Sequence, residues 1–270
     1  MSTGIEYTFD ASVLGLGGYY ERGGEQKLVP SIASVVLAPT GGEGWSSATN
    51  YDDGDIAFTH AESRVRGYKT SDGYFTTISD IYITNLRMFN KVSVALMQAT
   101  VTSTRNLSRD VDEAEFQLQA LYRGIDVDGT DVVPAVDVEV CHASYSSLLG
   151  NANLTALQPL TPADPVRSSI VNDLKHNAPE DVLKKHGKNV LEVPGFARLK
   201  FGDLVAKRGR RRVNLLTFDF NPFVAEPPAE GESNFVRALV AKVAKDGNSS
   251  SGSVTIASVG GNGEPIWPNP

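Results

Sequence analysis

The sequence contains very little cysteine and no long apolar run. Its 270 residues include a single cysteine, Cys141, which excludes an internal disulfide framework and any zinc site built from several thiolates. No segment approaches the roughly 18 consecutive apolar residues that a membrane-spanning helix requires, so we expect no membrane span. Hydrophobic residues make up 41% of the chain. We therefore expect a globular fold that is held by the packing of its core.

The familiar catalytic motifs are also absent. The chain contains no His-Glu-x-x-His, no Gly-x-Ser-x-Gly and no Walker loop. Cys141 is followed by His142, but neighbouring side chains on a strand point to opposite faces and cannot form a nucleophile and base pair. We interpret Cys141 as a buried structural residue. The sequence predicts a non-catalytic protein without a cofactor, and an enzyme with an unfamiliar site is an alternative.

The first residues carry no targeting signal. Residues 1–7 have neither a basic start nor an apolar stretch of the length found in secretory signals. We expect a cytoplasmic location by default, with export by a route without a signal segment as the alternative.

The first 160 residues follow the pattern of antiparallel strands. Apolar residues recur with period two, in runs that end at Gly, Asn and Asp. In Lys91–Thr104 both alternating sets are mostly nonpolar, which predicts a strand that is central or sandwiched between layers. Asp128-Gly129 predicts a hairpin turn with Gly129 at positive φ and a return strand over Ala135–Cys141.

The pattern changes between residues 160 and 190. Apolar residues at near-helical spacing predict one short helix over Val166–His176, and a second can begin at Pro179 and stop at Gly187. Strands are expected again over residues 197–206, 213–220, 235–244 and 253–259. The fold class predicted is mainly β: an antiparallel sandwich or partly rolled sheet with a short helical insertion near 165–187.

Three segments follow from this pattern. We expect residues 1–160 to form the main β domain and residues 161–190 to form a helical insertion or linker. Residues 191–270 add strands that complete the same domain or form a small second β layer.

The charge of the chain is unevenly distributed. Residues 1–165 carry 10 Lys and Arg against 21 Asp and Glu, a net charge of −11, and residues 166–270 carry 15 against 11, a net charge of +4. A nucleic-acid partner is unlikely because the total, −7, is acidic. The asymmetry instead suggests a homo-oligomer in which the basic part of one subunit meets the acidic part of another.

Two segments are candidate interaction sites. One is a basic cluster between two predicted strands, which fits an anion or an acidic protein surface, with a solvated turn as the alternative reading; it consists of Lys207, Arg208, Arg210, Arg211 and Arg212. The other is the proline-rich tail, in which Ile266 and Trp267 could supply an apolar contact. The leading hypothesis is a non-catalytic β-rich subunit that assembles through these complementary surfaces.

Two further hypotheses concern ligands. Asp52, Asp53 and Asp55 surround Gly54 and could offer oxygen ligands to calcium, although a solvated acidic turn explains them as well. Aromatic residues near Gly, Ser and Asp in predicted loops suggest the alternative function of a carbohydrate-binding β-sandwich module.

Overall fold

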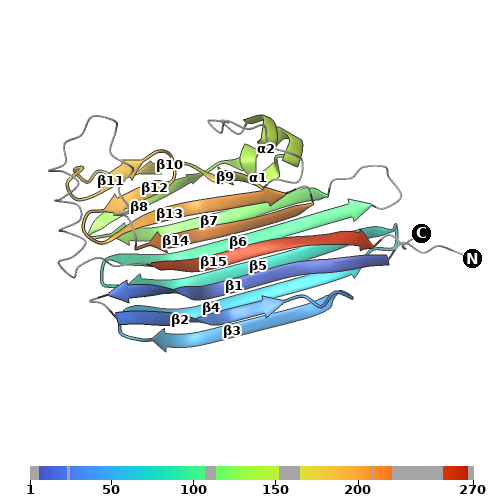
Figure 1. Ribbon diagram of the computed structural model, residues 1–270, viewed down its shortest axis with the longest axis horizontal. Coiled ribbons are helices and arrows are strands. Elements are labelled where there is room, and N and C mark those ends of the chain that lie inside the picture. The colour runs from blue at the N-terminus through green and yellow to red at the C-terminus, as the bar shows by residue number, and fades with distance from the viewer. Residues whose placement is uncertain are drawn as a thin grey trace, which may run out of the picture.

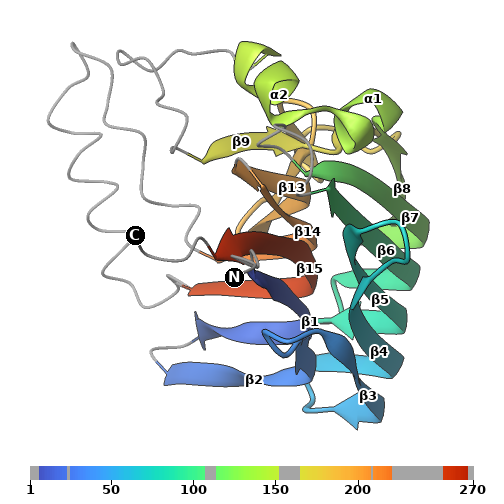
Figure 2. The same cartoon turned by 90° about the vertical axis from the view of Figure 1, so that its right-hand side faces the viewer.

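The described residues form a sandwich of two antiparallel sheets. The computed structural model describes residues 6–22, 25–106, 114–151, 165–207, 209–220 and 252–266. Long strands make up both layers, which Figure 1 shows one over the other and Figure 2 shows from the side. The mainly β sandwich predicted from the sequence is confirmed.

Sheet A contains strands from both ends of the described chain. Its strand order is β11-β12-β13-β14-β15-β1-β2, and β9 also pairs with β13. Its strands are β1 (Glu6–Arg22), β2 (Glu25–Val36), β9 (Val166–Ser169), β11 (Lys184–His186), β12 (Val190–Val193), β13 (Ala197–Lys207), β14 (Arg210–Asp219) and β15 (Gly252–Ile266). Because β15 pairs with both β14 and β1, it connects the later strands to the N-terminal hairpin (Figure 1).

Sheet B is a meander in which most strands pair with their neighbours in the sequence. Its order is β10-β8-β7-β6-β5-β4-β3. Its strands are β3 (Gly42–Asp52), β4 (Ile56–Lys69), β5 (Tyr74–Met88), β6 (Val92–Asn106), β7 (Glu115–Val127), β8 (Thr130–Val136) and β10 (Val171–Lys175). The hairpin between β7 and β8 is the predicted one, with Gly129 at a φ of +82°. The predicted strand over residues 235–244 lies outside the described residues.

Two corrections concern the helices. The predicted return strand over Ala135–Cys141 is wrong after Val136, because helix α1 (Val138–His142) begins there, followed by α2 (Tyr145–Asn151). Asp137 starts α1, since its side chain accepts hydrogen bonds from the backbone N–H groups of Glu139 and Val140.

The helical insertion near 165–187 is wrong, because that segment forms β9, β10 and β11. The buried residues Val166, Ile170, Val171 and Leu174 resemble a helical face. Their spacing arises instead because the chain crosses at Ile170 from sheet A to sheet B: β9 pairs with β13, whereas β10 pairs with β8.

The core lies between the two sheets. The middle of sheet A, β1 and β15, packs on β5 and β6 of sheet B. The side chain of Ser79 donates a hydrogen bond to the carbonyl of Gly260, and the hydroxyl of Tyr122 donates one to the carbonyl of Leu215. These bonds link the sheets and satisfy polar groups that would be costly to bury unpaired.

The alternation of buried and exposed residues reverses within several strands of sheet B, and the points of reversal form a line across the sheet. In β6, Val92 and Val94 are buried, and so are Met97, Ala99 and Val101, although the two sets differ in parity. Between them lie two successive residues that are at least partly exposed. The same step occurs in the neighbouring strands; the pairs are Thr49–Asn50, Thr59–His60, Thr84–Asn85, Ala95–Leu96 and Arg123–Gly124. We call this line the crease of sheet B.

Positive φ values accompany the crease on alternate strands. Asn50, Asn85 and Gly124 have φ values of +52°, +52° and +57°. Direct pairing skips these positions, as between Thr84–Leu96 and Leu86–Val94. A residue of this conformation inserted in a strand bends it and reverses its alternation.

Sheet A has a similar crease, but there the successive residues at the reversal are buried instead of exposed. In four of its described strands, two or three successive residues are buried, namely Gly15–Gly17, Leu215–Leu216, Ile256–Ala257 and Phe201–Gly202. Positive φ values occur again on alternate strands, at Ala33, Ala257 and Gly202. Paired residues thus face outward in sheet B and inward in sheet A.

Candidate functional site

The acidic turn between β3 and β4 uses its carboxylates within the fold. Oδ1 of Asp53 accepts hydrogen bonds from the backbone N–H groups of Asp55 and Ile56, at 3.0 and 2.7 Å. Oδ1 of Asp52 accepts one from the N–H of Gly54 at 2.9 Å. Within the described ranges, no three His, Cys, Asp or Glu side chains are grouped as metal ligands. These bonds stabilise the turn and account for the aspartates that suggested calcium.

The third aspartate of the turn joins it to sheet A. Oδ2 of Asp55 accepts hydrogen bonds from the hydroxyl of Tyr20 at 2.6 Å and from Nζ of Lys27 at 2.9 Å. Burial and then this bond to Asp55 raise the pKa of Tyr20 to about 12, and the bond to Asp55 also raises the pKa of Lys27. At neutral pH Tyr20 is therefore a neutral donor and Lys27 a cation.

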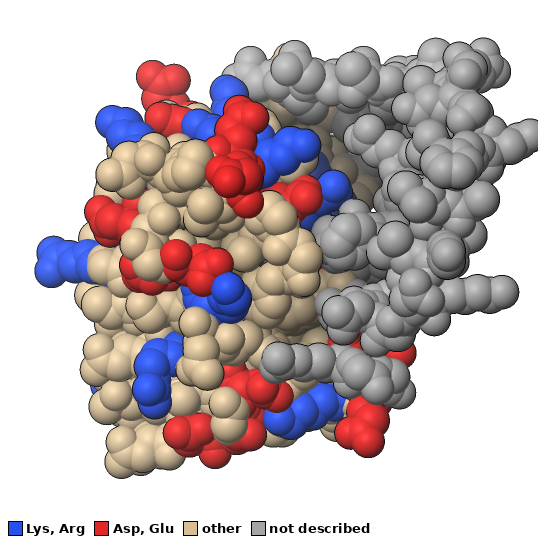
Figure 3. All heavy atoms as spheres, turned by 90° about the vertical axis from the view of Figure 1, so that its left-hand side faces the viewer, with Lys and Arg blue, Asp and Glu red and all other residues tan. Residues whose placement is uncertain are grey.

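The end of the sandwich that holds these turns carries charges of both signs. Figure 3 shows basic and acidic groups interspersed over this face. Lys27 pairs there with Asp55, and Lys91 pairs with Asp128 at 2.8 Å. Close pairing cancels most of the field of each ion at a distance.

The residues of the basic cluster lie in different environments. Arg210 forms an ion pair with Asp10 at 2.9 Å within the same chain. Arg211 is buried: its Nη1 donates to the carbonyl of Lys207 at 2.6 Å, and its guanidinium lies 4.5 Å from the ring centroid of Phe116. Lys207 and Arg212 are exposed. Arg210 is exposed as well, although it is paired with Asp10, and Arg208 lies outside the described residues.

The tail is described only in part. Ile266 ends β15, where its backbone lies opposite Glu6 of β1. Its side chain and the whole of Trp267 lie outside the described residues. Their role in self-association stays a prediction.

Cys141 lies on α1 rather than on a strand, so the argument that opposite strand faces separate it from His142 does not apply. Cys141 is buried and His142 is exposed. Burial, followed by the nearby Asp137, raises the pKa of the thiol to about 11. The thiol is therefore protonated near neutral pH, which is the state of a structural cysteine.

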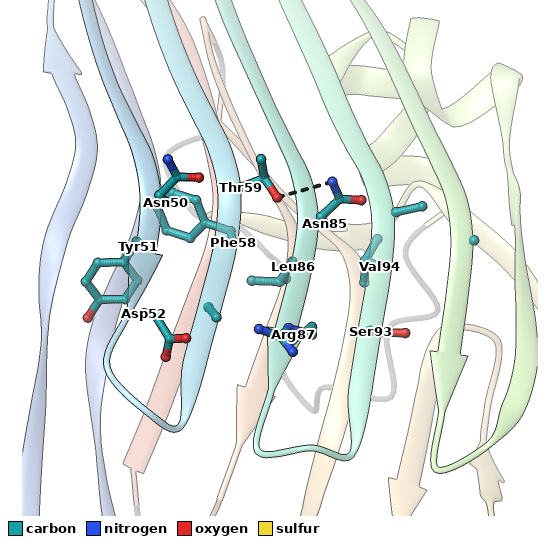
Figure 4. Close-up of a pocket in the computed structure, with 13 residues that line it drawn as sticks. Asn50, Tyr51, Asp52, Phe58, Thr59, Asn85, Leu86, Arg87, Ser93 and Val94 are labelled. Atoms are coloured by element: carbon teal, nitrogen blue, oxygen red, sulfur yellow. Dashed lines mark hydrogen bonds between the residues drawn. The ribbon is translucent and has the colours of Figure 1, made fainter.

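A hollow in the described surface follows the crease of sheet B. It is an open groove with a volume of about 610 Å³ that crosses β3 to β7 (Figure 4). One feature of the sequence indicated the crease, namely two asparagines within strands. Asparagine tolerates positive φ better than other residues with side chains. The lining residues are Asn50, Tyr51, Asp52, Ala57, Phe58, Thr59, Asn85, Leu86, Arg87, Ser93, Val94, Ala95 and Gly124.

Polar side chains line much of the groove. Phe58, Leu86 and Val94 also line the groove, but their side chains are almost wholly buried in the core. Asn85 lies on the crease, and its Nδ2 donates to the hydroxyl of Thr59 at 3.2 Å, which Figure 4 marks with a dashed line. This bond fixes the orientation of one amide while leaving its oxygen able to accept a further bond.

Arg87 lies between two small residues. The register across sheet B places it beside Ala57 of β4 and Ser93 of β6. Arg87 is exposed, and among the described residues no carboxylate lies within ion-pair distance of it. Neighbours of this size leave space beside the guanidinium, which is the arrangement of a donor available to a ligand.

Tyr51 and Asp52 form the end of the groove at the edge strand β3. The ring of Tyr51 stacks on Phe58 with a centroid distance of 5.3 Å, and its hydroxyl donates to Asp53 at 3.0 Å. Burial, followed by this hydrogen bond, raises the pKa of Tyr51 to about 12. The ring is held in one orientation, and its hydroxyl stays protonated.

The comparisons with known proteins place the groove within one family. No curated protein and no solved structure matches the chain. In the described part of the chain, neither helix has the length and apolar character needed to cross a membrane. One family model, described as a domain of unknown function (DUF8256), matches residues 7–156, which include all five strands of the groove. Since this match covers more than half of the 270 residues, the chain belongs to that family.

Proposed function

We propose that the protein is a non-catalytic binding module that holds a carbohydrate-type ligand in the groove of sheet B. The observation that carries the proposal is an open groove of about 610 Å³ that is lined by several polar side chains and by the ring of Tyr51. This volume is within the range of ligand sites, roughly 300 to 1,000 Å³.

The chemistry of the walls fits hydroxyl groups. The amides of Asn50 and Asn85 offer both donors and acceptors, Asp52 offers acceptors, and Arg87 offers donors in a planar fork. A sugar presents hydroxyls that donate and accept at the edges of a ring with apolar faces. The partly exposed ring of Tyr51, at the end of the groove, suits such a face.

Other ligand classes fit less well. Arg87 and Asp52 are the charged residues among the described lining residues, so the groove is neutral overall and does not favour a nucleic-acid backbone. A peptide that extends a sheet must run parallel to its strands. The groove crosses the strands, so it offers no such pairing.

The groove lacks the pair of acids that glycoside hydrolysis needs. Asp52 is the one carboxylate among the described lining residues, and the next in the same row across the sheet is Asp126 on β7. Four strand spacings of about 4.8 Å separate their backbones by about 19 Å. Hydrolases place their two carboxyl groups about 5 to 9.5 Å apart. Binding without cleavage is the function that this arrangement supports.

Two substitutions test the groove. Arg87→Ala and Asn85→Gly should each weaken binding of a glycan found by array screening by about tenfold, the equivalent of one charge-assisted or well-placed hydrogen bond. Glycine at position 85 removes the amide but keeps the φ of +52° without strain. Titration calorimetry measures the change.

Each variant has a matched control. Asn90→Gly changes an exposed asparagine with the same φ of +52° in the turn between β5 and β6, and Arg212→Ala removes an exposed arginine from β14 in the other sheet. Both controls should bind as the unmodified protein does. Equal affinities for all four variants would place the ligand elsewhere.

A second candidate function, self-association, is favoured by two sheet edges that no further described strand covers. β2 and β3 end the two strand orders on the same side of the sandwich (Figure 2). Large apolar side chains on these strands are exposed, with relative exposures of 77% for Leu28, 69% for Val36 and 71% for Trp45. Unpaired edges with apolar side chains are common association surfaces.

Sedimentation in low and high salt tests this candidate. If apolar contacts at the edges supply most of the affinity, the mass should exceed 29.0 kDa and change little when salt screens the exposed Lys207 and Arg212. A species of 29.0 kDa at every concentration would exclude self-association.

A further inference from the structure

The long axis of the groove runs across the strands. Its lining residues come from five successive strands, from Asn50 on β3 to Gly124 on β7. Neighbouring strands lie about 4.8 Å apart, so four spacings give a length of about 19 Å. A groove of this length and about 610 Å³ is much longer than it is wide.

Among the described residues, none beyond β3 at one end or β7 at the other lines the groove. β3 is the edge strand of sheet B, so among the described strands of that sheet none lies beyond Asp52. At the other end Gly124 has no side chain, and a Cβ added there would lie 2.8 Å from the Cβ of Ala95. Because β6 and β7 approach each other closely at Gly124, a residue with a side chain does not fit at this position, and no side chain projects from it into the groove.

Polar groups recur along the groove from strand to strand. β3 contributes Asn50, β4 contributes Thr59, β5 contributes Asn85 and β6 contributes Ser93. One hydrogen-bonding side chain thus follows another at roughly the strand spacing. A ligand that repeats the same chemical unit along its length can use each of them.

We infer that the ligand is an oligosaccharide chain that lies along the crease and is bound through its internal units, with both ends extending beyond the groove. This inference rests on the proposed carbohydrate-binding function. It adds that affinity depends on chain length and does not depend on the chemistry of the chain ends.

Chain length is the first test. The full chain is titrated with glucose, mannose, galactose and N-acetylglucosamine, and with their linear oligomers of two, four and six units. In the series that binds, the four-unit ligand should bind at least about tenfold more tightly than the single sugar, a difference of about 1.4 kcal/mol. Reduction of the terminal unit of the six-unit ligand to its alditol should change the affinity by less than about twofold.

A blocking variant is the second test. Ser93 points into the groove between Arg87 and Asp126 in the register of sheet B. Ser93→Tyr should bring the ratio of six-unit to two-unit affinity close to one, because the ring occupies the path of the chain. Thr102→Tyr is the control: Thr102 is a partly exposed residue of the same strand outside the groove, and its variant should keep the full ratio.

The results separate the inference from the function on which it rests. If single sugars bind as tightly as six-unit ligands, or if alditol formation abolishes binding, the chain inference is wrong and the carbohydrate site stands. An unchanged ratio in Ser93→Tyr also overturns the inference. If no sugar of any length binds, the proposed function itself fails.

Discussion

Replacing Gly18 by alanine should destabilise the protein more than any other proposed substitution, by about 4 kcal/mol or more. Gly18 has a φ of +141°, a region that residues with a side chain very rarely adopt. A Cβ at this position would lie 2.2 Å from the carbonyl oxygen of Ser253 and 2.9 Å from Cα of Val254. Both contacts are with the backbone of β15, so no side-chain rotation relieves them.

The expected loss is large because the clash lies where β1 meets β15. Backbone strain and overpacking together cost about 4 kcal/mol or more, against a total stability of about 5 to 15 kcal/mol for ordinary domains. Urea unfolding followed by circular dichroism measures the loss. Gly42→Ala is the control, since Gly42 has a φ of +103° but nothing within 4 Å of an added Cβ. Equal losses in the two variants would show that the approach of β15 does not matter.

Gly202→Ala should destabilise the protein by about 3 kcal/mol, from the cost of a left-handed conformation and of overpacking a core. Gly202 lies on the crease of sheet A with a φ of +63°. An added Cβ would lie 2.5 Å from Cγ1 of Ile170, the fully buried residue at which the chain crosses between the sheets.

A glycine of nearly the same conformation serves as its control. Gly195 has a φ of +70° and nothing within 4 Å of an added Cβ, so Gly195→Ala carries the backbone strain alone, about 1 kcal/mol. The difference between the two variants in thermal or urea unfolding isolates the contact with Ile170. If the two losses agree within about 0.5 kcal/mol, a scale typical of independent sites, the core has room for the methyl group.

Alternation predicted the class of fold but misread one face of β6. The segment Lys91–Thr104 is central, between β5 and β7. Its two apolar sets were interpreted as two buried faces, yet Val94 and Met97 are both buried toward the same core because the crease lies between them. The outer side of the strand carries Ser93 and Ala95, which line the groove.

The creases could not be predicted from local sequence. Asparagine or glycine marks some of the positions with positive φ, but Ala33 and Ala257 adopt φ values of +47° and +53° without any such signal. An alanine pays a cost of about 1 to 2 kcal/mol in this conformation. The pairing and packing of whole sheets must supply that energy, and a single strand does not reveal it.

The candidate site was missed for the same reason. Acidic and basic runs stand out in a sequence, and they drew attention to Asp52 and to Arg211. The structure uses the former partly in a turn and buries the latter against Phe116. The groove depends on residues 50, 59, 85 and 93, which come together only through strand register. Of the three aspartates considered in advance as calcium ligands, Asp52 is the one that lines it.

The crease determines which of the alternating residues of each strand face the core. The number of residues between a hairpin turn and the crease decides which side chains enter the core: Ile125 and Val127 are buried between the crease at Gly124 and the turn at Asp128. One residue inserted into that short segment would exchange their places with Asp126, whereas two would restore the phase. Length changes in related chains should therefore collect at the turns, or occur within strands in even numbers.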